Sequence, residues 1–334
     1  MLGRWTAGLL IALALVLCLG ETIVADATIV LKYGHPNAPA SIAGRQADLF
    51  AKLVAEKTGN RIRIQVYPAS QLGTLSELVE ATKIGSIDIS HNTYAGISTL
   101  YEDFAVFDTP YLFDSPEHLM KTVAPDSPLM KQFNEKLIAR AGVRVLYSFY
   151  LGTRHLTANR PVYSTADLKG VKIRSIPFPI YTATVEGMGA IATPIDFAEL
   201  PSALATGIVS GQENPLDIIW AQKFYETQKY LIMTGHIIGA DGVIINERSW
   251  QRLSPELQSL ILEAARETAA TALEWNLTVE AELVDKLRQA GMTVIDEKSG
   301  LRLDEIKKRV KDAVERRFGS QWNKYWSQIA KMGK

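Results

Sequence analysis

One stretch of the chain constrains the fold more than any other, because it predicts a helix longer than a small domain is wide. Ser254-Pro255 is a common helix start, and neither glycine nor proline follows until Gly291. A helix over 255–290 has about 36 residues and is about 54 Å long. A helix of this length is too long for one small domain, so we expect it to span two packed units. The length of 334 residues also suggests two domains.

The composition is that of an ordinary globular protein. Hydrophobic residues make up 47% of the chain and charged residues 22%, which is enough apolar surface for a core. Basic and acidic side chains number 36 each, whereas nucleic-acid-binding proteins usually carry a basic excess. We therefore expect no nucleic-acid partner, and we expect a monomer.

The first 27 residues have the pattern of a secretory signal peptide. The apolar run over 9–19 is too short for a transmembrane helix, and Ala25-Asp26-Ala27 has the small-x-small form of a cleavage site. Cleavage after Ala27 removes Cys18, the only cysteine. The exported chain would then have no disulfide, no thiol nucleophile and no thiolate metal site.

Strands and helices alternate along the rest of the chain. Alternating polar and apolar residues predict strands over 28–33, 61–67, 87–90, 143–149, 154–157, 171–174 and 243–246. Capping signals and helical periodicity predict helices over 42–57, 74–84, 180–187 and 214–225, and helix starts at 116 and 128. This order predicts α/β units with a largely parallel sheet, and the stretch over 302–334 predicts two more helices.

The chain carries none of the common catalytic signatures. It has only five histidines, and it contains no HExxH, no G-x-S-x-G and no P-loop. The segment 187–192 matches G-x-G-x-x-A, but it follows a predicted helix, which is the wrong order for a dinucleotide-binding turn. We therefore expect a protein that is not an enzyme and that holds neither a cofactor nor a metal.

Polar residues at the ends of predicted strands are candidates for binding an anion. Arg174 ends one strand, and Arg154 follows another extended stretch. Ligands of open α/β sheets bind beyond the carboxyl ends of strands, and an Arg guanidinium matches a carboxylate with two parallel hydrogen bonds. Asn214-Pro215 predicts a helix start with Asn214 as N-cap, and a helix N-terminus also favours anions. From spacing alone, a surface salt bridge is the alternative role for either arginine.

Several short motifs occur along the chain in an order that resembles one family. They are Leu31-Lys32-Tyr33-Gly34-His35, Tyr67-Pro68-Ala69-Ser70-Gln71-Leu72-Gly73, Gly152-Thr153-Arg154, Gly170-Val171-Lys172-Ile173-Arg174, Thr193-Pro194 and Gly211-Gln212-Glu213-Asn214-Pro215. Together they resemble the extracytoplasmic solute receptors of tripartite ATP-independent periplasmic (TRAP) transporters, of the four-carbon-dicarboxylate type. The resemblance covers nearly the whole chain after residue 27.

The resemblance implies a two-lobed periplasmic binding fold of the α/β class. A ligand cleft would lie between the lobes, and a long helix would span both. By analogy, lobe I comprises 28–151 and 240–279, and lobe II comprises 152–239 and 280–334. The implied function is a receptor in the periplasm that captures a small organic acid by an Arg–carboxylate salt bridge and lobe closure. It would deliver the acid to the membrane permease subunits of the transporter.

The resemblance also assigns ligand contacts. The family's two cleft arginines, its asparagine and its pocket phenylalanine fall on Arg174, Arg154, Asn214 and Phe197. Four further positions, each with packing or capping as an alternative role, are Phe178, Tyr94, Glu77 and His35. Glu77 also stands in a predicted capping box with Thr74.

The sequence leaves the ligand and two other functions open. Dicarboxylates, sugar acids, and keto or aromatic acids all suit a pocket centred on an arginine. Phe178 stands where the family often has a smaller residue, which favours a ligand with a flat or apolar part. A receptor that signals through a partner protein would bind the same ligand. A periplasmic enzyme would use Glu213 and a histidine.

Overall fold

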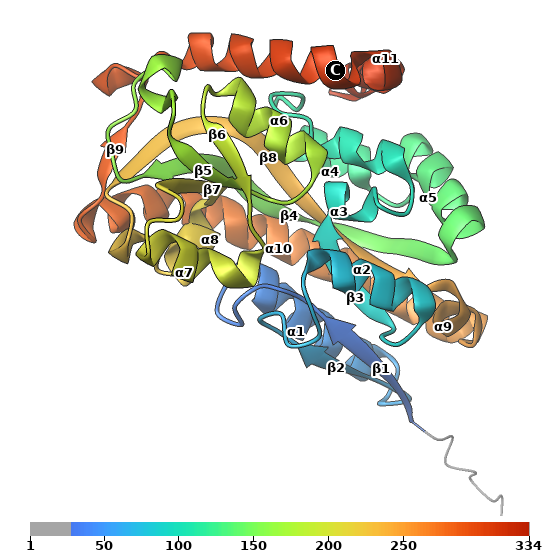
Figure 1. The fold of residues 1–334 in the computed structure, drawn as a ribbon. Coiled ribbons are helices and arrows are strands. Elements are labelled where there is room, and N and C mark those ends of the chain that lie inside the picture. Colours follow the sequence, from blue (N-terminus) through green and yellow to red (C-terminus); the bar gives the residue numbers. More distant parts are fainter. Residues whose placement is uncertain (1–27, 334) are drawn as a thin grey trace, which may run out of the picture.

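A single mixed sheet runs through the molecule (Figure 1). The computed structural model describes residues 28–333, so the predicted signal peptide lies outside the described residues. The strands are β1 (Ile29–Gly34), β2 (Ile62–Tyr67), β3 (Ile89–Thr93), β4 (Val143–Ala158), β5 (Lys172–Ser175), β6 (Ile191–Pro194), β7 (Gly211–Pro215), β8 (Tyr230–Asn246) and β9 (Thr293–Ile295). They follow the order β2-β1-β3-β8-β4-β7-β5-β6, with β9 paired to β8.

Helices cover both faces of this sheet. They are α1 (Ile42–Lys57), α2 (Leu75–Ile84), α3 (Tyr94–Ile97), α4 (Pro116–Val123), α5 (Pro128–Ala141), α6 (Pro179–Gly187), α7 (Leu200–Ala205), α8 (Leu216–Ala221), α9 (Glu247–Gln251), α10 (Pro255–Gln289) and α11 (Leu303–Met332). On β8, Ile244 packs in the core with α4, α5 and α11, whereas Val243 and Ile245 pack with α1 and α10. This is the period-two alternation of a strand whose two faces are both buried.

Two long antiparallel strands, β4 and β8, form the centre of the sheet. They have 16 and 17 residues, where the sequence predicted short separate strands. The ladder shifts register at three places, one of them between Tyr150 and Gly152. Each shift interrupts the alternation of polar and apolar residues, so the pattern looks like several strands in the sequence. β1–β3 lie on one side of this pair and β5–β7 on the other (Figure 1).

The prediction of a largely parallel sheet is wrong at the centre and correct at the two ends. β8 pairs antiparallel with both β3 and β4, and β4 pairs antiparallel with β7. The outer pairs, β1 with β2 and β5 with β6, are parallel. Parallel strands are joined by crossover helices, and the sequence pattern reveals these helices. The pairing of β4 with β8 joins segments far apart in the chain, so no local pattern predicts it.

The long helix is confirmed as α10. It has 35 residues, about 52 Å in length, and the Oγ of Ser254 accepts a hydrogen bond from its first turn. Ile261 and Ala272 pack with α1, whereas Leu283 and Leu287 pack with α7 in the other half of the molecule. α10 therefore braces both halves.

α10 is also fastened to β4 where the central ladder changes register. The Asn276 Nδ2 donates to the carbonyl of Tyr150 at 2.6 Å. The Glu280 carboxylate accepts from the N–H of Thr153 at 2.7 Å. Both side chains are mid-helix, so α10 fixes the backbone on either side of the register shift between Tyr150 and Gly152.

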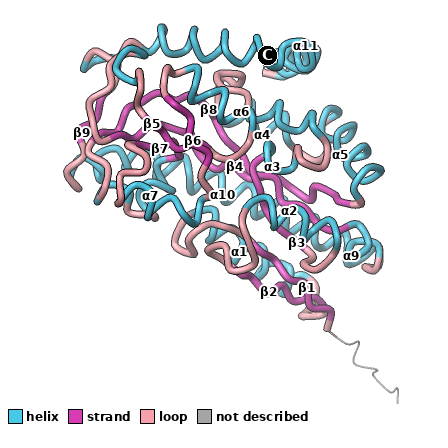
Figure 2. Tube along the Cα trace, in the orientation of Figure 1, coloured by secondary structure: helices cyan, strands magenta, loops and turns pink. Residues whose placement is uncertain are grey.

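The C-terminal stretch forms one helix, α11, where the sequence predicted two. Gly319 lies within its 30 residues without ending it. Ile306 and Val310 pack in the core that contains β5, whereas Trp322 and Tyr325 pack in the core that contains α4 and α5. The segment that the resemblance places in lobe II therefore touches both halves (Figure 2). None of the helices in the described part of the chain is long and apolar enough to cross a membrane.

Candidate functional site

Arg174 is a buried cation with two free donors at the carboxyl end of a strand. It lies on β5 opposite Thr193 of β6. Its side chain is 0% exposed, and its Nε donates to the carbonyl of Ile195 at 2.8 Å. Nη1 and Nη2 are buried and have no hydrogen-bond partner. Burial lowers the pKa of Arg174 to about 10, so the group remains charged at neutral pH. Two parallel free N–H groups match a carboxylate.

Arg154, by contrast, already has an anionic partner. Its Nε donates to Oε2 of Glu213 at 2.6 Å, and its Nη2 donates to Oε1 at 2.9 Å. Burial by itself would raise the pKa of Glu213, but the Arg154 charge and the hydrogen bonds from His236 and Arg154 together outweigh it, and the pKa falls to about 2. Arg154 follows an extended stretch as predicted, but it lies inside β4 and not at a strand end, because the strand continues to Ala158.

His236 extends this ion pair into a three-residue group. Its Nε2 lies 2.9 Å from Oε2 of Glu213, and its Nδ1 lies 2.8 Å from Oγ1 of Thr234. Burial lowers the pKa of His236, so the imidazole is neutral at pH 7. Because a carboxylate only accepts, the proton lies on Nε2 and is donated to Glu213. Arg154, Glu213 and His236 form a fixed, charge-balanced group.

Asn214 is not a helix N-cap, which corrects the prediction. β7 continues through Pro215, and α8 begins at Leu216 without a side-chain cap. Asn214 lies opposite His155 in the sheet, and its Oδ1 accepts from Nη2 of Arg154 at 3.1 Å. A proline at the end of a strand produces the same Asn-Pro pattern as a helix start, which is why the sequence misled.

The two predicted phenylalanines have different surroundings. Phe197 begins the short 3₁₀ helix η3 (Phe197–Glu199), and the guanidinium carbon of Arg174 lies 6.0 Å from its ring centroid. Phe178 precedes α6 and is 4% exposed, within the core that also contains Tyr181. Tyr181 in turn lies 5.2 Å from the guanidinium carbon of Arg154. Phe197 is thus a neighbour of Arg174, and Phe178 is a core residue.

The three predicted ligand contacts in the N-terminal segment, Glu77, Tyr94 and His35, differ in whether their polar atoms already have hydrogen-bond partners. Glu77 closes its capping box by accepting from the N–H of Thr74 at 2.8 Å, and this hydrogen bond lowers the pKa of Glu77. Tyr94 is buried and donates to Oγ of Ser148 at 2.6 Å. His35 is buried and stacks on His91 at 4.9 Å, and neither of its ring nitrogens has a partner. Only His35 has buried polar atoms left free.

Two buried aspartates near this group were missed by the sequence analysis. Asp241 lies on β8 opposite Thr93, and its Oδ1 is buried without a partner. Burial raises the pKa of Asp241 to about 7, although the Arg154 charge opposes this. Asp108 accepts from the N–H of Ala95 at 2.7 Å, and burial raises its pKa to about 8. No local motif marks either residue, because only the packing of distant segments buries them.

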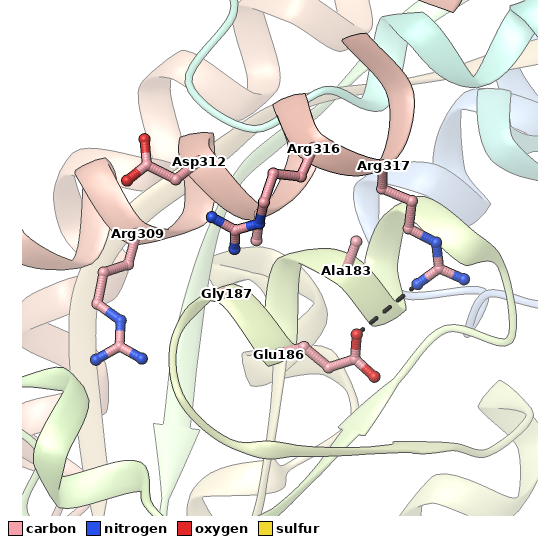
Figure 3. A pocket seen from close by; sticks show the side chains of 8 residues that line it. Ala183, Glu186, Gly187, Arg309, Asp312, Arg316 and Arg317 are labelled. Carbon is pink, nitrogen blue, oxygen red and sulfur yellow. Dashed lines mark ion pairs between the residues drawn. The ribbon is translucent and has the colours of Figure 1, made fainter. Parts of the chain in front are cut away.

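Three surface hollows lie away from Arg174. The first, of about 560 Å³, lies between α6 and α11, and its lining includes Arg309 and Arg316 (Figure 3). There Arg317 pairs with Glu186 at 3.7 Å. The second, of about 620 Å³, lies between α5 and α10, and the third, of about 360 Å³, lies beside Tyr111. None of the three is lined by a predicted site residue, and no cluster of three or more metal-ligating side chains occurs within residues 28–333.

The continuous sheet, the bracing helix and the buried arginine define a two-lobed α/β solute-binding protein. Residues 33–320 match the family described as bacterial extracellular solute-binding protein, family 7, and the chain belongs to this family. Its homologues and structural neighbours are periplasmic solute-binding proteins of TRAP transporters. They are receptors and not enzymes. The family and the fold that the motifs suggested are therefore confirmed.

Three relatives show how far the similarity extends. The sialic acid-binding periplasmic protein SiaP of Vibrio cholerae is 31% identical, over 84% of this chain and 86% of that protein. The C4-dicarboxylate-binding periplasmic protein DctP of Rhodobacter capsulatus is 29% identical, over 96% and 97%. A TRAP periplasmic solute binding protein from Roseobacter denitrificans, with bound L-galactonate, has a TM-score of 0.84 and 28% identity, over 90% and 98%.

The buried ionisable groups predict that stability is greatest near pH 6.5. Burial lowers the pKa of four histidines, so unfolding takes up protons as the pH falls below 6.5. They are His35 (to about 4), His155 (to about 3), His91 and His236. Their stabilisation is present above pH 6.5 and is lost as the pH falls. Asp108 and Asp241 act in the opposite direction, because their raised pKa values of about 8 and about 7 make stability fall as the pH rises through them.

The net effect follows from the proton count. Below pH 6.5 the uptake by histidines increasingly exceeds the release by the two aspartates, so the free energy of unfolding falls by about 1.4 kcal/mol per pH unit for each proton of excess. Denaturant titrations from pH 5 to 8.5 measure this profile. Asp241→Asn should flatten the alkaline limb and steepen the acid limb, because Asp241 releases a proton on unfolding throughout pH 5–7. A wild-type stability that rises steadily to pH 8.5 would contradict the assignment.

Proposed function

We propose that this protein is the periplasmic receptor of a TRAP transporter and that it captures a small organic acid by a salt bridge between the acid's carboxylate and Arg174. The observation that carries the proposal is the buried guanidinium of Arg174, whose two Nη groups have no partner among the described residues. A carboxylate satisfies both groups at once. The ligands named for two relatives, sialic acid and L-galactonate, are carboxylic acids.

The proposed lobes meet at a pair of glycines beside a register shift of the central ladder. Gly152 lies opposite Gly239 in the central ladder, directly after the register shift, and its φ is +120°. Glycine is the residue that tolerates such angles, and a bulge weakens the ladder locally. These features support a division into lobe I (28–151 and 240–279) and lobe II (152–239 and 280–334).

Lobe movement is needed because the site is closed. Arg174 is fully buried, so a solute reaches its Nη groups only when the lobes separate. The acid would first engage Arg174 on lobe II, and lobe I would then close over it, a hinge closure of the periplasmic-binding kind. The closed receptor would deliver the acid to the membrane permease subunits.

The remaining predicted residues receive unequal support as ligand contacts. Phe197 lies beside Arg174, and His35 has free ring nitrogens. Arg154 and Asn214 hydrogen-bond each other, so they would form a fixed polar wall of the pocket. For Phe178, Tyr94 and Glu77, which pack or cap in this structure, contact with the ligand rests on the family resemblance alone.

Catalysis by Glu213 and a histidine has less support. The low pKa and the two hydrogen bonds from Arg154 make the Glu213 carboxylate a weak base near neutral pH. We therefore propose a receptor that is not an enzyme and that works as a monomer, without a nucleic-acid partner. A receptor that signals through a protein partner would share the site, and uptake measurements with the permease subunits would separate the two.

A thermal-shift screen tests the proposal. The panel would contain dicarboxylates, aldonates, uronates, sialic acid, and keto and aromatic acids. The cognate acid at 100 times its Kd should stabilise the protein by about 2.7 kcal/mol, which is a clear upward shift of the melting midpoint. The same acid should leave the midpoint of Arg174→Ala unchanged. If no organic acid shifts the wild type, or if the variant shifts equally, the proposed function is wrong.

A further inference from the structure

The number of buried cations limits the negative charge that the site accepts. Of the lysines and arginines that the structure describes, only Arg154 and Arg174 are buried. Arg154 is neutralised by two hydrogen bonds to the Glu213 carboxylate, at 2.6 and 2.9 Å. Of these two arginines, only Arg174 keeps buried donors without a partner. One free guanidinium pairs with one carboxylate, and a second buried carboxylate would have no cation.

The buried acids act against a second carboxylate. Asp241 lies in the sheet opposite Phe149 and Thr93. It is close enough to Arg154 that the positive charge of Arg154 opposes the rise in the pKa of Asp241. The charges of Asp108 and Asp241 both raise the pKa of Tyr181, and the Tyr181 ring lies beside the Arg154 guanidinium. Burial raises the pKa of Asp241 to about 7 and that of Asp108 to about 8, so this region disfavours a buried negative charge. A second carboxylate would meet the same cost, whereas a hydroxyl group would find a hydrogen-bond partner in the free Oδ1 of Asp241.

The other free polar atoms at the strand ends are uncharged. Ser175 follows Arg174 at the end of β5, and its Oγ is buried without a partner. His35 follows β1 in the opposite half, and both of its ring nitrogens are buried without a partner. Burial lowers the pKa of His35 to about 4, so at neutral pH it offers one donor and one acceptor. Unpaired buried polar groups of this kind are rare, and hydroxyl groups of a ligand match them.

We infer that the acid bound at Arg174 has a single carboxylate and an uncharged, hydroxyl-bearing remainder, as in an aldonic acid, and is not a dicarboxylate. The carboxylate pairs with Arg174, and the hydroxyl groups bond to Ser175, His35 and Asp241. This inference rests on the proposed function, because it takes Arg174 as the carboxylate site. It selects one of the ligand classes that the sequence left open.

Calorimetric titration with matched pairs of acids tests the inference. Gluconate is compared with glucarate and galactonate with galactarate, since each pair differs only in whether the last carbon is a hydroxymethyl group or a carboxylate. Succinate and hexanoate complete the set. At least one aldonate should bind about 100-fold more tightly than its matched aldarate and than succinate. Hexanoate should bind more weakly than that aldonate.

The outcomes separate the inference from the proposed function. If an aldarate or succinate binds as tightly as the aldonates, and Arg174→Ala abolishes that binding, the inference is wrong and the proposed function stands. If hexanoate binds with the same affinity as the best aldonate, the inferred hydrogen bonds to ligand hydroxyl groups are wrong. If none of the six acids binds, the inference is wrong, and the proposed function also fails if the wider thermal-shift panel finds no ligand.

A substitution tests the role of Asp241 within the site. Measured at pH 8.5, where a pKa of about 7 leaves Asp241 ionised, Asp241→Asn removes a negative charge and keeps the shape, so the preference for an aldonate over its aldarate should fall by about tenfold. Asp304→Asn, an exposed position on α11, is the control and should keep the wild-type ratio. A cooperative melt first establishes that each variant is folded, and Asp108→Asn replaces Asp241→Asn if the latter is not. An unchanged ratio in a folded variant contradicts the assigned role of the aspartates.

Discussion

Arg174→Ala is expected to abolish ligand binding and to leave the fold intact. Removal of one partner from a buried, hydrogen-bonded ion pair costs about 3–5 kcal/mol, which corresponds to a loss of affinity of more than about 100-fold. The unliganded protein should not be destabilised, because the only described hydrogen bond of the side chain runs from its Nε to Ile195. The loss of a buried, incompletely paired charge offsets that bond. Calorimetry and a thermal melt measure the two effects.

A second variant separates charge from geometry. Arg174→Lys keeps a positive charge but replaces the planar fork with a single ammonium group, which forms no bidentate pair with a carboxylate. Its affinity should fall between those of the wild type and Arg174→Ala. An alanine variant that binds the same acid within threefold of the wild type would contradict the assignment of Arg174.

Glu213→Ala is expected to have the largest effect on stability. The substitution leaves the Arg154 cation buried and removes the partner of Nε2 of His236, at 2.9 Å in this structure. The predicted loss in the free energy of unfolding is about 3–5 kcal/mol. Urea denaturation monitored by circular dichroism measures it.

Matched variants distinguish a buried charge from a general effect of losing a glutamate. Glu102 pairs with Arg140 at 2.9 Å on the surface, and Glu102→Ala should cost no more than about 1 kcal/mol. The double variant Arg154→Met with Glu213→Met replaces both charges by apolar side chains and should recover part of the loss. If Glu213→Ala is as stable as Glu102→Ala, the Arg154–Glu213 pair does not stabilise the fold as the structure indicates.

Local features of the chain were predictable because their cause lies within a few residues. The capping box of Thr74 and Glu77 forms as expected, and so does the cap of α10 at Ser254. In each case a side chain satisfies a free N–H of the first helical turn, a contact that spacing alone defines. The length of α10 followed from the absence of glycine and proline.

Long-range pairing was not predictable from the same information. The Arg154–Glu213 contact joins residues 59 positions apart, and the central ladder joins Val143 to Asn246. The buried state of Asp241 depends on three segments of the chain and leaves no mark in the sequence around it. Arg174 was found because its chemistry and its strand-end position both pointed to an anion, but its two unpartnered Nη groups became visible only in the structure.

A crystal structure of the protein with its acid bound tests the central claim most directly. We predict that one carboxylate of the acid lies within about 3 Å of both Nη1 and Nη2 of Arg174, with the ring of Phe197 beside it. The Arg154–Glu213 pair should remain in place. A bound acid whose carboxylate is held elsewhere, with the Nη groups of Arg174 still lacking an anionic partner, would contradict the account.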